Sequence, residues 1–81
     1  MKLDWKEHII VDEKIAFGKP VISGTRLTVE FIFGLLASGW SSKEILKNYP
    51  KLKDKDIQAV FAFAFEAMKD GFMFKNPGIS R

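Results

Sequence analysis

Three helix-start signals in residues 28–69, each followed by apolar residues at helical spacing, restrict this chain to a mainly helical fold. The first signal is Thr28, a residue type that commonly caps helix N-termini. The residues after it place one apolar stripe on a helix: Val29, Ile32, Phe33 and Leu36. Gly39 follows as a C-terminal stop, because glycine readily adopts the left-handed conformation that ends helices. The sequence therefore predicts a first helix between Thr28 and Gly39.

A second, shorter helix is predicted from Ser41 to Asn48. Ser41 and Glu44 form the pattern of a capping box, in which each side chain bonds the backbone amide of the other residue. Pro50 ends this helix, because proline cannot continue the helical hydrogen-bond ladder. The residues expected to face inward are Ile45, Leu46 and Tyr49.

The third helix is predicted from Asp54, its expected N-cap, to about Lys69. Its segment "VFAFAF" alternates large and small residues, which is also typical of a strand. The cap, the alanines and a length of about 16 residues favour a helix. One face is expected to enter the core: Ile57, Val60, Phe61, Ala64, Phe65 and Met68. Phe63 is expected to point away from that core, with Ala59, Ala67 and Asp56 near it.

The N-terminal part has the composition of a small β-ribbon at about residues 8–27. Residues 8–11 form one extended candidate, and residues 20–22 and 26–29 form two more around a Ser-Gly-Thr turn. The whole chain, 1–81, is expected to be a single domain with a helical core at about 28–69 and a tail at 70–81. The fold class is therefore mainly α, with a short ribbon before three helices.

Composition limits the compartment and the chemistry. The chain has no cysteine, which excludes disulfides, thiolate catalysis and cysteine-based zinc sites. Its charged first residues do not form a secretory leader, and its longest apolar run is far shorter than the roughly 20 residues that span a bilayer. A cytoplasmic location is therefore expected, with no membrane partner.

The residue combinations of common enzymes are also missing. His8 is the single histidine, so it cannot anchor an ordinary zinc site, and as a general base it would need an orienting partner. An edge-strand histidine is the simpler interpretation. The segment "GKPVISGTR" has its lysine after the first glycine, unlike a phosphate-binding loop, and is better explained as a turn. We expect no enzyme activity, no metal and no cofactor.

The net charge of +3 arises in the second half of the chain, since residues 1–41 carry five cations and five acids. Five lysines crowd one short region: Lys43, Lys47, Lys51, Lys53 and Lys55. Such a patch suits phosphate backbones, and a merely solvated helix-turn surface is the alternative.

Apolar surface is in excess for so short a chain. The eight phenylalanines cannot all be hidden when a chain of this size buries only about 60% of its unfolded surface. A second copy or another protein is the expected cover, so a homo-oligomer, most simply a dimer, is predicted. The residues assigned to this partner or dimer interface are Phe63, Ala59, Ala67, Phe72 and Phe74. Membrane adsorption is disfavoured because the lysines cluster away from the Phe-rich helix.

Two sequence motifs together resemble one known family. The first is "GKPVISGTRLTV", and the second is "LLASGWSSKEILKNYPKL", followed by "DIQAVFAFA". In this order and spacing, over roughly residues 5–68, they resemble the domain of unknown function 433 family. The resemblance implies a homeodomain-like helix-turn-helix core. It also implies a type II antitoxin of the VapB kind, which binds operator DNA and masks a PIN-like ribonuclease toxin.

In a helix-turn-helix unit, residues 41–48 would be the supporting helix and residues 54–69 the recognition helix. The expected DNA contacts are Lys19, Arg26, Lys51, Lys53, Lys55 and Gln58, with Gln58 suited to an adenine edge. Asp54 and Asp56 at the start of that helix, and the Ala and Phe run after it, fit DNA poorly. Two hypotheses therefore stay open: a DNA-binding antitoxin or small regulator, and a protein-interaction module that does not bind nucleic acid.

Overall fold

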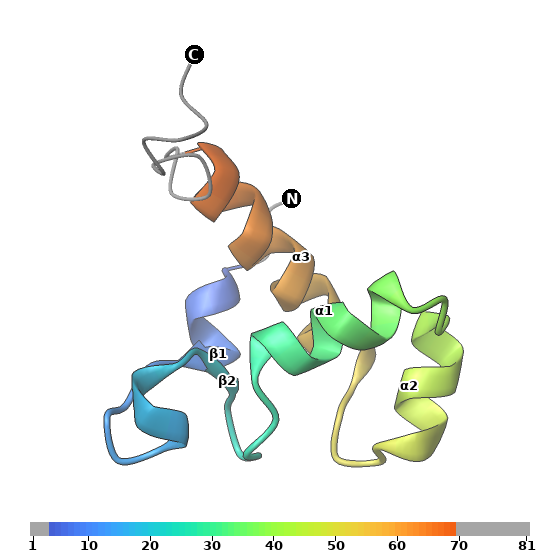
Figure 1. Cartoon of the computed structure of the whole chain (residues 1–81), viewed down its shortest axis with the longest axis horizontal. Helices are drawn as coiled ribbons and strands as arrows, with labels where there is room; N and C mark the ends of the chain where they lie inside the picture. Colours follow the sequence, from blue (N-terminus) through green and yellow to red (C-terminus); the bar gives the residue numbers. More distant parts are fainter. Residues whose placement is uncertain (1–3, 70–81) are drawn as a thin grey trace.

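Three α-helices and a two-stranded sheet make up the computed structural model, which describes residues 4–69. The helices are α1 (Val29–Ala37), α2 (Ser42–Asn48) and α3 (Asp54–Lys69). Figure 1 shows the ribbon beside α1 and the lower part of α3, with α2 on the other side. The predicted mainly α fold with a short N-terminal ribbon is confirmed. The expected tail at 70–81 lies outside the described residues.

The ribbon is shorter than the sequence suggested. Strands β1 (Ile9–Ile10) and β2 (Val21–Ile22) are antiparallel, with Ile9 opposite Ile22 and Ile10 opposite Val21. A single bridge joins Val21 to Thr28, so the chain after the turn stays extended until α1 begins. Two 3-10 turns flank β1, namely η1 (Trp5–Glu7) and η2 (Ala16–Gly18).

The caps of α1 and α2 are those that the sequence predicts. Thr28 accepts a hydrogen bond from the Phe31 amide at 2.9 Å. At the other end of α1, Gly39 has a φ of +100°, its amide donates to the Leu36 carbonyl, and the next amide donates to the carbonyl of residue 35. These are the two bonds of a Schellman motif. Ser41 and Glu44 form a reciprocal capping box at the start of α2.

The start of α3 corrects one prediction, because Asp54 is the first helical residue and not the cap. The Lys53 carbonyl accepts the bonds of the first turn, and the Lys53 amide donates to Asp56 Oδ2 at 2.9 Å. Asp56 thus reaches back from the third helical position, as the acidic member of a capping box does. Asp54 still adds negative charge to the helix N-terminus, where it is favourable.

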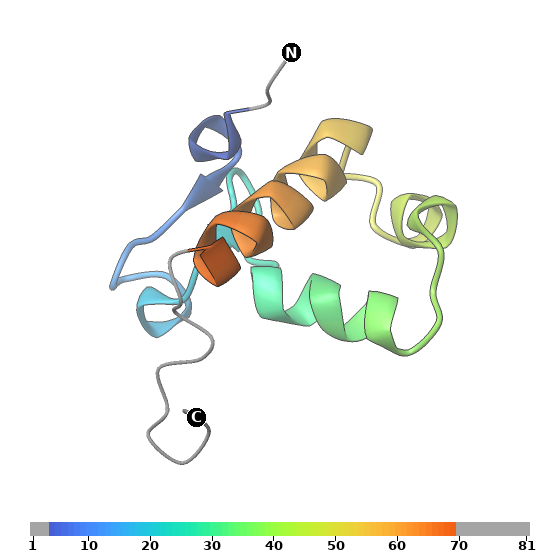
Figure 2. The same ribbon diagram turned by 90° about the horizontal axis from the view of Figure 1, so that it is seen from above.

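The core lies between the ribbon and the three helices. Its fully buried side chains come from β2 and from all three helices: Val21, Ile22, Ile32, Ile45, Ala59 and Val60. Figure 2 shows α3 between the N-terminal segment and α1. That position decides which faces of α3 are covered, because one face meets α1 and another meets η1. No helix within residues 4–69 is long and apolar enough to span a bilayer.

Candidate functional site

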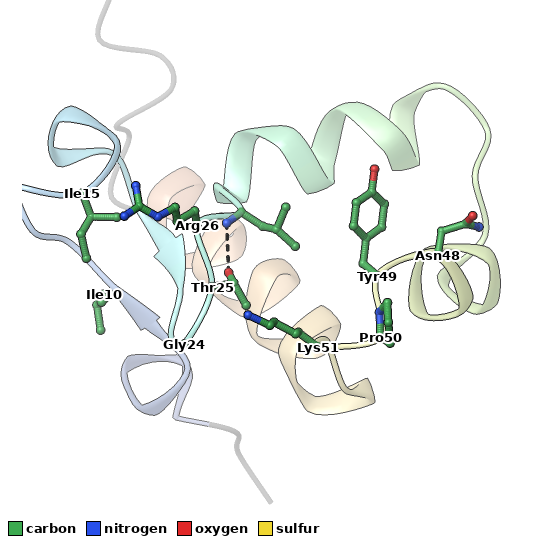
Figure 3. A pocket seen from close by; sticks show the side chains of 10 residues that line it. Ile10, Ile15, Gly24, Thr25, Arg26, Asn48, Tyr49, Pro50 and Lys51 are labelled. Atoms are coloured by element: carbon green, nitrogen blue, oxygen red, sulfur yellow. Dashed lines mark hydrogen bonds between the residues drawn. The ribbon is translucent and has the colours of Figure 1, made fainter.

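A cavity of about 740 Å³ lies where the turn after β2 meets the turn between α2 and α3. Residues 24–27 line one side and residues 48–51 line the other (Figure 3). These segments contain the Gly24-Thr25-Arg26 and Tyr49-Pro50 parts of the two motifs described above. The fold thus brings two distant motifs together around one cavity, which makes this cavity the candidate site.

The ribbon side of the cavity is fixed by Thr25. Its hydroxyl donates to the Ile22 carbonyl at 2.8 Å and accepts from the Leu27 amide at 3.0 Å. Gly24 has a φ of +82°, a conformation that side-chain-bearing residues rarely adopt. This turn leaves Arg26 exposed at the cavity, as expected of a rigid loop that presents a cation.

The helical side is fixed by the end of α2. The Tyr49 amide donates to the Ile45 carbonyl, and the Tyr49 ring packs edge to face on Phe31 with centroids 5.7 Å apart. Pro50 then turns the chain, and Lys51 follows it as an exposed residue. In Figure 3, Lys51 extends from this turn toward Thr25.

A second cavity, of about 570 Å³, adjoins the first, since Lys51 lines both. Lys53 and Lys55 line this second cavity and are exposed. Within residues 4–69, no salt bridge involves Arg26 or any of these three lysines. Four of the six predicted DNA contacts therefore form one basic groove across the two cavities: Arg26, Lys51, Lys53 and Lys55.

The other two predicted DNA contacts lie elsewhere. Gln58 is exposed on α3, beyond the lysines. Lys19 pairs with Glu30 at 3.0 Å between Nζ and Oε1, and Glu30 lines a different, apolar cavity. The charge of Lys19 is therefore compensated outside the basic groove.

The predicted partner interface needs correction. Ala59 is completely buried within the chain, so it cannot belong to a surface. Phe63 does not point away from the core, because its ring packs edge to face on Trp5 with centroids 4.8 Å apart. Ala67 and Phe63 line an apolar cavity of about 460 Å³ with residues of α1. Phe72 and Phe74 lie outside the described residues.

The exposed apolar surface of α3 lies on the opposite face from the one expected. Phe61, Phe65 and Met68, which the sequence pattern places in the core, are 49%, 62% and 46% exposed. Phe33 of α1 meets Phe61 edge to face at 5.9 Å and extends this surface. We call Phe61, Phe65 and Met68 the aromatic stripe. The helical spacing of these residues was visible in the sequence, but their orientation was not.

One contact was not found from the sequence at all. His8 Nδ1 lies 3.1 Å from Asp56 Oδ1, and both side chains are largely covered. His8 therefore has an orienting carboxylate and is not a simple edge-strand histidine. No sequence signal joins two residues 48 positions apart. Within residues 4–69, no group of three or more acidic, histidine or cysteine side chains could hold a metal ion.

Comparison with known families matches residues 9–64 to the family described as protein of unknown function (DUF433). Among solved structures, the crystal structure of a DUF433 member protein from Anabaena variabilis ATCC 29413 is similar, with a TM-score of 0.71 and 26% sequence identity. The similarity covers 76% of this chain and 61% of that protein, so this chain spans less than two thirds of the relative. No protein with a curated description matches the chain.

Proposed function

This chain belongs to the DUF433 family of proteins of unknown function, and we propose that it is a small DNA-binding regulator of the antitoxin type that acts as a homodimer. The observation that supports the proposal is the basic groove. Two motif segments distant in sequence place Arg26 and Lys51 around one cavity. Lys53 and Lys55 line the adjoining cavity, which three carboxylates also line: Glu7, Asp54 and Asp56. Unpaired cations on one face are the electrostatic footprint of a phosphate-binding protein.

In this proposal the groove binds the DNA backbone and α3 contributes the sequence-reading residue. The four cations would contact phosphates, which position the protein without reading sequence. Gln58, exposed one turn further along α3, would meet a base edge. The order α2–turn–α3 has the connectivity of a helix-turn-helix unit.

The aromatic stripe limits how α3 can lie on DNA. Phe61 and Phe65 follow Gln58 along the exposed side of the helix, and a phenylalanine face does not suit a polar groove. We therefore assign only the start of α3, as far as Gln58, to DNA and the stripe to protein contacts. Those contacts would be a second copy of the chain or, in an antitoxin, a PIN-like ribonuclease toxin.

The test measures the affinity for duplex DNA by fluorescence anisotropy at a series of salt concentrations. With four phosphate contacts per protomer, and so eight per dimer, affinity should fall about ten-thousandfold from about 50 to 200 mM salt. A flat salt dependence, or no binding at the lowest salt, would contradict the proposal.

The second candidate is a protein-interaction module that does not bind nucleic acid. The aromatic stripe favours this candidate, because exposed contiguous apolar side chains mark protein-binding surfaces. It predicts self-association together with no DNA binding at any salt concentration. The anisotropy experiment therefore separates the two candidates.

A further inference from the structure

His8 and Asp56 form an oriented pair beside the basic groove. The pair joins the start of β1 to the first turn of α3, with Nδ1 and Oδ1 3.1 Å apart. The side chains are 22% and 15% exposed. Asp56 Oδ2 accepts the Lys53 amide at 2.9 Å, and the His8 carbonyl accepts the Ser23 amide at 2.7 Å. The Asp56 carboxylate is thus held by two contacts, and the backbone of His8 is held by a third.

This arrangement determines which nitrogen of His8 takes up a proton. An ionised carboxylate can only accept hydrogen bonds, so Nδ1 carries the proton that Asp56 accepts. The nitrogen that is left to accept a further proton is therefore Nε2. Within residues 4–69, Nε2 has no hydrogen-bond partner.

The charged residues that line the second cavity together with His8 have a formal charge that sums to zero. The cavity of about 570 Å³ that His8 lines is also lined by three lysines, at positions 51, 53 and 55. Three carboxylates face the same cavity: Glu7 from η1, and Asp54 and Asp56 from α3. The formal charge of the lining is zero with His8 neutral and +1 with His8 protonated. A proton on His8 would therefore give the lining a net positive charge, which favours a bound anion.

We propose that this cavity binds a phosphate group together with a protonated His8, so that nucleic-acid binding tightens as the pH falls. The proposal rests on the proposed function. It adds that phosphate binding at one end of the basic groove depends on pH. A bound phosphate favours the imidazolium, and by linkage the imidazolium favours the phosphate. The Nε2 proton and the lysine ammonium groups supply donors to the phosphate oxygens.

The first experiment measures duplex DNA affinity at constant ionic strength from about pH 8 to pH 6. The duplex carries no terminal phosphate, so its backbone diesters stay ionised throughout and any pH dependence comes from the protein. We expect affinity to rise about tenfold, the lower end of what one hydrogen bond between charged groups supplies. Calorimetry in buffers of different ionisation enthalpy should show proton uptake on binding.

The matched variant is His8→Asn, whose side-chain amide can still donate to Asp56 but does not titrate. Its DNA affinity should be independent of pH, while Lys69→Gln at the other end of α3 should keep the wild-type dependence. Circular dichroism checks that the variants fold. If His8→Asn does not fold, proton uptake by the wild-type protein still decides the question.

A second experiment tests the cavity without DNA. Sulfate is a dianion across this pH range and stands in for the phosphate group. Because the chain has one histidine, its ring proton resonances report on this cavity alone. Sulfate should shift them more at low pH than chloride does at equal ionic strength. DNA binding with no pH dependence and no proton uptake overturns this proposal and leaves the proposed function standing. No DNA binding, with a pH-dependent response to sulfate, rejects the proposed function and supports the cavity. No response to either ligand rejects both.

Discussion

Trp5 and Phe63 pack edge to face, with ring centroids 4.8 Å apart and ring planes at 87°, although they lie near opposite ends of the described chain. This contact seals the N-terminal segment onto α3. It covers the helix face on which Ala59 is completely buried. The face of α3 that the sequence suggested for a partner is therefore occupied by the chain itself.

Phe63→Ala should destabilise the fold much more than Phe65→Ala. Phe63 is half-buried against Trp5 and the core, so its removal should lower the free energy of unfolding by about 2–3 kcal/mol. Phe65 is 62% exposed, and its replacement should cost about 0.5 kcal/mol or less. Urea denaturation of the two variants measures both values. Equal losses would show that Trp5 does not cover Phe63.

Trp5→Phe should be tolerated, whereas Trp5→Ala should not. The indole nitrogen Nε1 is buried without a hydrogen-bond partner in the described structure, and such a donor costs about 1–3 kcal/mol. Phenylalanine keeps an aromatic ring against Phe63 and removes the unpaired donor. We expect the stability of Trp5→Phe to lie within about 1 kcal/mol of wild type, and Trp5→Ala to lose about 3 kcal/mol. Thermal unfolding at equal protein concentration compares them, and equal losses would contradict the expectation.

Arg26→Gln combined with Lys51→Gln should weaken DNA binding uniformly across duplex sequences. The two side chains line one cavity and have no salt-bridge partner in the described structure, so they are free to contact phosphates. Losing two such contacts in each protomer of the dimer should make the slope of log affinity against log salt shallower by about 4. Lys14→Gln with Lys69→Gln is the charge-matched control and should leave the slope unchanged. The same loss in both double variants would indicate a general charge effect and no specific groove.

Phe65→Glu should shift a homodimer toward monomer, because Phe65 lies at the middle of the aromatic stripe and is exposed in the single chain. Introducing a carboxylate into an apolar contact leaves an unpaired charge there. Sedimentation velocity measures the change. Phe17→Glu is the control, since Phe17 is 97% exposed and lies outside the stripe. A dimer that survives Phe65→Glu would place the interface elsewhere. Phe63→Glu is unsuitable for this purpose, because Phe63 belongs to the chain's own core.

The local features of the fold could be predicted from the sequence because local chemistry determines them. Thr28, Gly39 and the Ser41–Glu44 box each act within one helical turn, and each is found where the sequence places it. Asp54 is the exception. The capping contact comes from Asp56, and two acids at alternate positions offer the same signal in sequence.

The orientation of α3 could not be predicted, because its apolar residues go almost all the way round the helix. Both Phe63 and Phe65 fit a core by spacing alone. Trp5 decides which of the two is covered, because its ring packs on Phe63. Trp5 lies in a short 3-10 turn whose sequence has no hydrophobic periodicity that would predict this contact. The His8–Asp56 pair is also non-local, so the sequence could not predict that His8 lines the second cavity beside Asp56. The four cations of the basic groove were predicted by type and position, and the fold determined that they adjoin.

The packing of Trp5 and His8 against α3 has a consequence for synthesis on the ribosome. Residues 5–8 are made before the helix that receives them, and α3 is the last of the described elements to be translated. The nascent chain cannot close its core until the core residues of α3, from Ile57 to Phe63, have left the exit tunnel. Folding of this domain is therefore expected as one late, cooperative event, and a translation arrest within α3 should leave the earlier segments sensitive to protease.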